Sequence, residues 1–244
     1  MLLIEKYFAL LSVLLVPVLY IITCSLFYLL LYKWKPKTFQ AHKIQTQSLA
    51  PAQLRREINY TIISLLIFCL MGYVVYLLQQ KGFSQLYFKI SDYGITYFII
   101  SILLMTVLHD TYFYWTHRLL HLRGWYEKVH IVHHLSSNPS PFTALAFHPV
   151  EAFIQAGITP LIVLIIPCHP IALSVFLLYM TVKNVLGHCG FELTGNYFTN
   201  NKVTRWRNSS THHNLHHFYA KDNYGLYFTF WDRWMKTLRN KSNS

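Results

Sequence analysis

The sequence predicts an all-α integral membrane protein, with about four to five transmembrane or re-entrant helices and a cytosolic helical cap rich in histidine. Of its 244 residues, 54% are hydrophobic and only 12% are charged, about half the charged share of an ordinary soluble domain. Long stretches of the chain contain no charged residue at all. The histidines gather in clusters whose spacing is helical, which indicates helices outside the apolar stretches as well.

The uncharged stretches define the predicted helices in chain order. Residues 7–32 form a run of 26 uncharged residues, long enough to cross a hydrocarbon core of about 30 Å. A signal peptide is disfavoured, because the run is too long for one and no small-residue cleavage site follows it. Residues 58–80 form a second run, and the shorter run 93–108 continues into 111–116. Residues 152–182 are uncharged but contain three prolines, which predicts two short helices in a hairpin that crosses or re-enters the membrane.

The distribution of basic residues predicts which side each loop occupies. The segments 33–57, 109–151 and 183–244 fall on one side of this topology and hold 18 of the 21 Lys and Arg residues. Positive charge gathers on the cytosolic side of membranes, so we expect this side to be cytosolic and the N-terminus to lie outside. The same side holds 13 of the 14 histidines, all except His169. No nucleic-acid-binding signature accompanies the net charge of +12, so nucleic acid is not an expected partner.

Three histidine clusters repeat a helical spacing. They are His117/His121, His130/His133/His134 and His213/His216/His217, and residues at i, i+3 and i+4 share one face of a helix. Imidazole suits iron, zinc, copper and nickel, and eight imidazoles exceed the needs of a single ion. The spacing therefore predicts a site for two metal ions. The four cysteines are scattered and add no metal-binding or disulfide spacing.

These clusters and the motifs around them resemble the fatty acid hydroxylase/sterol desaturase superfamily over roughly residues 50 to 240. The resemblance rests on the run from His109 to His121, on the His-x-x-His-His repeats, and on shorter motifs: His148-Pro149-x-Glu151, Gly187-His188-x-Gly190-x-Glu192, Asn223-Tyr224-Gly225 and Trp231-Asp232-Arg233. It implies a helical membrane fold and a di-iron centre that oxidises a lipid with dioxygen. It also implies three parts: an N-terminal helix with a basic loop (1–49), a catalytic domain (50–240) and a polar tail (241–244).

The resemblance also implies which side chains hold the metals. The family's ligand positions match His117, His121, His130, His133, His134, His213, His216 and His217, and His188 matches a further histidine that completes the site. His212 remains possible, because His212/His216 and His213/His217 are both i, i+4 pairs. His109 and His148 are expected beside the ligands, and His42 and His169 are expected to have no part in the site.

Three carboxylates are candidate partners for the ligating imidazoles, which usually donate their second N–H to a carboxylate. Asp110 lies seven residues before His117 and therefore shares its helical face. Glu151 and Glu192 are the other two, although a salt bridge to a nearby Arg or Lys would explain either equally well. Lys236 stands where the family usually has a glycine, which predicts a changed C-terminal turn.

The expected reaction is hydroxylation or desaturation of a membrane lipid such as a sterol or fatty acyl chain, with zinc as a possible substitute for the two irons. No haem, flavin or nicotinamide motif is visible, so a separate electron donor is expected, either a small cytochrome or a ferredoxin with its reductase. The membrane is either the endoplasmic reticulum or a bacterial inner membrane. The alternatives are an acyl desaturase of the other membrane di-iron group, a haem-binding electron carrier, and a zinc-holding or metal-transporting membrane protein.

Overall fold

The computed structural model describes residues 7–45, 47–194, 201–202 and 204–239, so the predicted tail 241–244 lies outside the described residues. Within this part the chain is helical, and its only β-structure consists of three isolated bridges. Four long helices make the body: α2 (Phe8–Tyr28), α4 (Pro51–Gln80), α5 (Gly94–Leu120) and α10 (Pro170–His188). The shorter helices are α3 (Pro36–Phe39), α6 (Arg123–Trp125), α7 (Ile131–His134), α8 (Pro149–Ala156), α9 (Ile158–Ile165), α12 (Ser210–Tyr219) and α13 (Phe230–Trp234).

The four long helices are membrane spans. Each contains an apolar window of 18 residues, of which only 28 to 44% is buried inside the protein. A helix that is apolar all round and mostly uncovered must face lipid rather than water. With the π-helical turn Leu29–Trp34, the first span covers Phe8–Trp34. The predicted all-α membrane fold is therefore confirmed, with four helices of spanning length in the described part of the chain.

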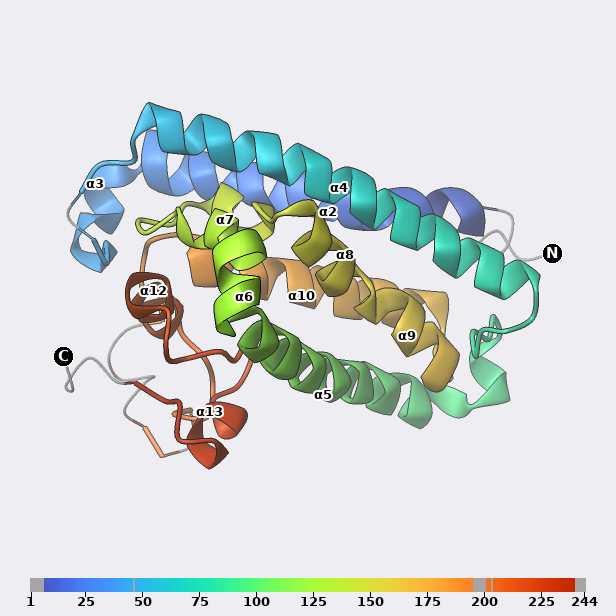
Figure 1. Ribbon diagram of the computed structural model, residues 1–244. Coiled ribbons are helices and arrows are strands. Elements are labelled where there is room, and N and C mark those ends of the chain that lie inside the picture. The colour runs from blue at the N-terminus through green and yellow to red at the C-terminus, as the bar shows by residue number, and fades with distance from the viewer. Residues whose placement is uncertain (1–6, 46, 195–200, 203, 240–244) are drawn as a thin grey trace.

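All the connections that carry histidine clusters lie at one end of the helical bundle. In Figure 1 this end, at the left, holds α3, α6, α7, α12 and α13, whereas the N-terminus and the loop after α4 lie at the opposite end. At that opposite end the 81–93 loop pairs with the turn before α10, where Tyr87 N donates to Cys168 O at 3.2 Å. The histidine-bearing segments that the sequence places on one side of the membrane therefore lie together at one end of the bundle, which we call the cap end.

The predicted hairpin over residues 152–182 is uneven. Its first arm is split into the short helices α8 and α9, while its second arm, α10, has 19 residues and is long enough to span. Helix α9 ends at Ile165 because the residue before a proline avoids the α conformation, and Ile166, which precedes Pro167, is extended at φ −107° and ψ 118°. The side chain of His169 then accepts a hydrogen bond from Ile171 N and caps α10.

The segment that follows the second histidine cluster is held against α2 and α4 by buried polar contacts. Glu57 on α4 is 1% exposed and accepts hydrogen bonds from Ser140 Oγ at 2.5 Å and from Gln53 Nε2 at 2.7 Å. Tyr20 and Thr61 both donate to Phe142 O, at 3.1 and 3.0 Å. A buried carboxylate needs such donors, and these contacts hold the loop that follows α7 against the membrane bundle.

The C-terminal turn keeps the conformation that a glycine would adopt there. Lys236 has φ +58°, so the prediction that lysine changes the turn is wrong. The turn is held by Asp232, which accepts hydrogen bonds from Tyr224 N and Gly225 N, each at 2.9 Å, and from Thr237 Oγ1 at 2.8 Å. These contacts are sufficient to hold a lysine in the left-handed region at a cost of roughly 1 kcal/mol.

Candidate metal centre

Four segments bring their histidines to one place at the cap end of the bundle. Helix α5 ends on the first cluster, the π-helical turn Tyr126–His130 and α7 carry the second, and α12 carries the third. His188 is the last residue of α10. The i, i+3 and i+4 spacings place the imidazoles of each cluster on one helical face, as predicted.

The nine imidazoles divide into two groups. The potential ligand nitrogens within each group all lie within 4.8 Å of one another. The first group has five members: His117, His121, His130, His134 and His216. The second has four: His133, His188, His213 and His217. These are the nine residues to which the family resemblance assigns the metals, and His212 belongs to neither group.

The spacing of the nitrogens suits metal coordination. In the first group, His117 Nε2 lies 3.1 Å from His130 Nε2, and His216 Nε2 lies 3.1 Å from His134 Nε2 and 3.2 Å from His121 Nε2. In the second group, His188 Nε2 lies 3.2 Å from His133 Nε2 and 2.8 Å from His213 Nε2. Two ligands at right angles around an ion, with bonds of about 2.1 Å, are roughly 3.0 Å apart.

The hydrogen bonds of the other ring nitrogens show why a cation fits between the Nε2 atoms. Nδ1 of His117 lies 2.9 Å from Tyr224 O, and Nδ1 of His130 lies 2.8 Å from the carboxylate of Glu151. A backbone carbonyl can only accept, so Nδ1 of His117 must carry the proton, and the Glu151 carboxylate, in its ionised form, requires the same of His130. In the neutral rings the two Nε2 lone pairs then face each other at 3.1 Å, an arrangement that repels unless a cation lies between them.

The same tautomer is set twice more by backbone carbonyls. Nδ1 of His188 donates to Asn184 O at 2.8 Å, and Nδ1 of His216 donates to Asp222 O at 2.6 Å. Metal-ligating imidazoles use their second nitrogen in this way, which fixes the ring orientation. Each group therefore contains imidazoles whose Nε2 lone pairs are already directed at their neighbours.

Burial keeps the cap histidines in the neutral form that binds metals. Loss of contact with water is the largest cause, and neighbouring imidazoles lower the values further. The pKa is shifted well below the usual value for His133, His134, His213, His216 and His217. At neutral pH these rings thus offer lone pairs without first releasing a proton.

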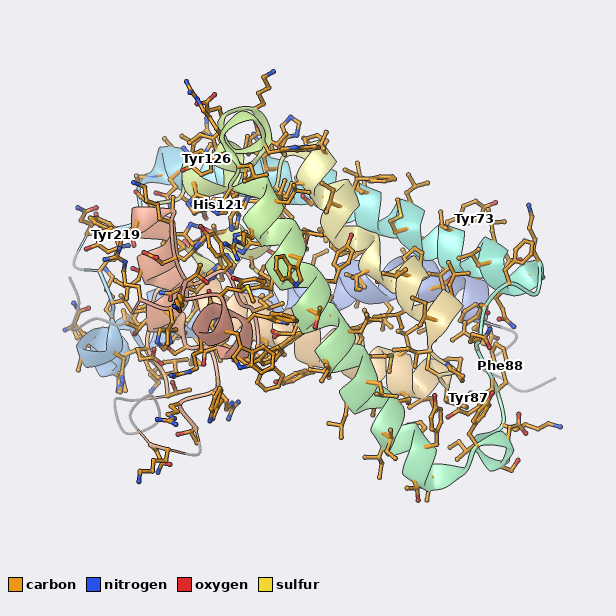
Figure 2. All side chains as sticks on the ribbon, turned by 60° about the horizontal axis from the view of Figure 1, so that its bottom comes forward. Tyr73, Tyr87, Phe88, His121, Tyr126 and Tyr219 are labelled. Atoms are coloured by element: carbon orange, nitrogen blue, oxygen red, sulfur yellow. The ribbon has the colours of Figure 1, made fainter. Side chains whose placement is uncertain are left out.

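His121 is the member of the first group that reaches the surface. Its ring is half-buried, whereas those of the other eight are buried. Its ring contacts Tyr126, with ring centroids 5.3 Å apart, and the two labelled residues lie close together in Figure 2. His121 is therefore the place where the first group comes nearest to the surrounding medium.

Of the three carboxylates expected beside the imidazoles, Glu151 alone contacts one. Its bond to His130 joins two side chains that are each 1% exposed. The expectation is wrong for Asp110, whose Oδ1 accepts from Tyr227 N at 2.8 Å and Phe228 N at 3.3 Å. It is also wrong for Glu192, whose oxygens accept from Thr194 and from Thr211. Both carboxylates bind loop and helix-terminal groups that sequence spacing does not reveal.

The remaining histidines lie outside the two groups. His109 Nδ1 is 2.7 Å from the Tyr227 hydroxyl. His148, expected beside the ligands, instead caps α8 by accepting from Val150 N at 3.2 Å. His212 Nδ1 is 3.0 Å from Ser209 Oγ. His42 is exposed and His169 lies at the opposite end of the bundle, as expected for residues without a part in the site.

Several groups that shape the site escaped sequence reasoning. The carbonyl acceptors of Asn184, Asp222 and Tyr224 orient three imidazoles, and a backbone carbonyl has no sequence signature. Asp232 has one, the Trp-Asp-Arg motif, and its role is to hold Tyr224 and Gly225 in place. The spacing of the Trp-Asp-Arg motif does not reveal that Asp232 binds the backbone of Tyr224 and Gly225.

Comparison with known proteins gives consistent matches. Residues 102–237 match the family described as fatty acid hydroxylase. The chain is 31% identical over 193 residues to a lathosterol oxidase of Homo sapiens, covering 78% of this chain and 63% of that protein. It is 33% identical over 187 residues to a Delta(7)-sterol 5(6)-desaturase of Gibberella zeae, covering 77% and 56%. It is 32% identical over 183 residues to a lathosterol oxidase of Mus musculus, covering 74% of this chain and 60% of that protein.

In each of these three cases the chain spans less than two thirds of the relative's length. No solved structure matches the chain significantly.

Proposed function

The chain belongs to the fatty acid hydroxylase family, and from that premise we propose that it oxidises a sterol in the membrane with dioxygen, at two metal ions. The observation that carries the proposal is the pair of histidine groups, five and four imidazoles, at the cap end of four membrane spans. A site held entirely by neutral imidazoles next to lipid suits redox chemistry on an apolar substrate.

The proposed substrate class follows from the relatives. Two of them are named lathosterol oxidases and one a Delta(7)-sterol 5(6)-desaturase. We therefore propose a Δ7-sterol as substrate and the introduction of a double bond between C5 and C6 as the reaction. The sequence alone predicts either a sterol or a fatty acyl chain as substrate, and either hydroxylation or desaturation as the reaction. The proposal selects the sterol and desaturation.

Iron is the proposed metal in both groups, with zinc as a possible substitute. Two irons, when bound, would supply the dioxygen activation that an unactivated C–H bond requires. The chain's own contribution is to hold the ligands in one tautomer and to exclude water. Glu151 holds His130, and the carbonyls of Tyr224, Asn184 and Asp222 hold three more imidazoles.

Electron balance requires a partner. Removing two hydrogens from the sterol supplies two electrons and two protons, whereas reducing dioxygen to two waters consumes four of each. Two electrons and two protons must therefore come from outside in every turnover. We propose a separate one-electron carrier, a small cytochrome or a ferredoxin with its reductase, as the source. The basic residues at the cap end suit an acidic carrier.

The proposed orientation places the cap in the cytosol and the N-terminus outside, in the endoplasmic reticulum or a bacterial inner membrane. It rests on the 18 of 21 basic residues in the three segments at the cap end. Protease protection of tags placed at either end, in sealed vesicles, tests this orientation.

The decisive experiment combines metal content with sterol turnover. We expect the purified full chain to hold two irons and, with dioxygen and a reduced carrier protein, to convert a Δ7-sterol into a product lacking two hydrogens. Mass spectrometry distinguishes this product from one that gains an oxygen. Tightly held zinc, with no turnover after iron loading and reduction, would contradict the proposal and favour a zinc-holding protein.

Single substitutions test the ligand assignment. His133→Ala and His217→Ala should each abolish turnover and lower the metal content, because each removes an imidazole from the second group. The matched control is His42→Ala, since His42 is exposed and lies outside both groups. Full activity in the His133 variant would refute the assignment.

A further inference from the structure

A small cavity with charged and amide side chains in its wall opens directly against the second histidine group. Its volume is about 30 Å³, enough for a group the size of a water molecule or a hydroxyl, and it lies between the end of α10 and the start of α12. His188 and His213 form part of its wall. Lys183, Asn184 and Asn208 are among its other lining residues. A ligand in this cavity would therefore lie beside the proposed metal centre.

Lys183 is an unusual component of this wall. It lies in the last turns of helix α10, at the end that carries His188, and the residue is only 9% exposed. A charged residue that is buried in protein is costly unless its donors find partners. Its Nζ donates to Asn208 O at 3.2 Å. An ammonium group has three N–H donors, so this bond leaves donor capacity next to the cavity.

Asn208 supplies the complementary acceptor. It is 7% exposed, and its Nδ2 donates to Gly225 O. Among the described residues, nothing donates to its Oδ1, which is buried. A buried acceptor without a partner is costly. A spare donor on Lys183 and an unpaired acceptor on Asn208 therefore stand side by side in one cavity wall.

This pair selects for one kind of ligand group. A hydroxyl both donates and accepts a hydrogen bond, so it can satisfy the Asn208 oxygen and the Lys183 ammonium together. An anion could pair with Lys183 and with Arg207, which lines the same cavity, but a carboxylate or fully ionised phosphate offers no hydrogen to Asn208 Oδ1. The unpaired Asn208 oxygen is therefore the group that favours a neutral hydroxyl over an anion.

We propose that this cavity binds the ring hydroxyl of the sterol and so sets which carbon is presented to the metals. The inference rests on the proposed function. In a sterol, the hydroxyl-bearing carbon C3 is separated from C5 by a single ring carbon. A hydroxyl site must therefore border the metal ligands directly, and this cavity borders two of them.

Binding to the metal-free full chain tests the proposal without turnover. Tritiated lathosterol and its 3-O-methyl ether are equilibrated with the protein in nanodiscs, and their dissociation constants are compared. We expect the free sterol to bind about tenfold more tightly or better, because methylation removes the hydrogen given to Asn208 and crowds Lys183. In Lys183→Met the preference should fall to within about threefold, and Lys183→Arg should restore part of it.

The matched control is Thr181→Val on the same helix. Thr181 is buried and its hydroxyl donates to Leu177 O at 2.8 Å. We expect this variant to keep the wild-type preference. If Lys183→Met does not fold, acetylation of Lys183 in the wild type gives the same information, since lathosterol should protect the amine and the ether should not.

Three results would overturn the inference: no preference in the wild type, an undiminished preference in a folded Lys183→Met protein, or equal protection by both sterols. Any of them would leave water as the occupant of the cavity. Failure of the proposed function is recognised separately, because iron-loaded wild type would then bind sterol without oxidising it.

Discussion

The contact between Glu151 and His130 allows a quantitative test of how the protein holds its proposed metals. His130 Nδ1 lies 2.8 Å from Glu151 Oε1, and both side chains are 1% exposed. On its other side, His130 Nε2 faces His117 Nε2 at 3.1 Å. The carboxylate therefore fixes the tautomer of an imidazole that points into the first group, and it raises the basicity of that imidazole.

Glu151→Gln keeps the size of the side chain and replaces its carboxyl group with an amide, which cannot ionise. Loss of such a partner typically lowers metal affinity 10- to 100-fold, which corresponds to about 1.4–2.7 kcal/mol. The glutamine carbonyl can still accept from Nδ1, so we expect Glu151→Gln to lower the metal affinity about tenfold. Glu151→Leu should lower it about 100-fold, because it leaves the His130 N–H buried without a partner.

The assay is competition for Fe²⁺ between the purified full chain and a calibrated chelator under anaerobic conditions. Glu192→Gln is the matched control, since its carboxylate bonds to Thr194 and Thr211 and to no histidine. We expect its metal affinity to stay within about twofold of the wild type. Wild-type affinity in Glu151→Gln, or an equal loss in Glu192→Gln, would refute the reasoning.

Three further predictions concern stability. A Cβ on Gly72 would overlap the backbone carbonyl of Ser12 on α2, so Gly72→Val should lower the stability by about 1–3 kcal/mol or more, measured as a lower melting temperature in detergent. Gly124→Ala is the control and should not lower it, because a Cβ there meets nothing within 4 Å. Lys236→Gly should raise stability by about 1 kcal/mol in the same melting experiment, because the residue has φ +58°; no gain would show that the turn is unstrained. The metal-free protein should lose stability as the pH falls below about 6.5, by up to roughly 1.4 kcal/mol per pH unit for each buried cap histidine. The sign follows because burial lowers the folded-state pKa of these rings, so the unfolded chain binds more protons; a melting temperature that stays constant from pH 7.5 to 5.5 would contradict this.

Local patterns account for most of what could be predicted. The lengths of the uncharged stretches identified the spans, because crossing a membrane requires a fixed length of apolar helix. The i, i+3 and i+4 spacing placed each histidine cluster on one helical face, because helix geometry depends on neighbouring residues alone. The resemblance added His188, which stands apart from the three clusters and would not have been chosen by spacing.

Predictions that depended on a distant partner succeeded less often. Of the three carboxylates proposed to hold imidazoles, Glu151 contacts one, whereas Asp110 bonds to residues 117 and 118 positions away. The conformation of Lys236 was also misjudged, because the contacts of Asp232 rather than the residue's own preference hold the turn.

The sequence by itself predicted the helical membrane fold, the gathering of the histidines at one end of it and, with the family resemblance, the nine imidazoles that the structure brings together. The tertiary structure decided how those imidazoles divide into five and four, which acceptor fixes each ring, and that Lys183 meets Asn208 beside them. The physical reason is distance along the chain. The length of an apolar stretch and the periodicity of a helix depend on residues that are near one another in the sequence. The hydrogen bond from His117 to Tyr224 joins residues 107 positions apart and forms only once the helices have packed.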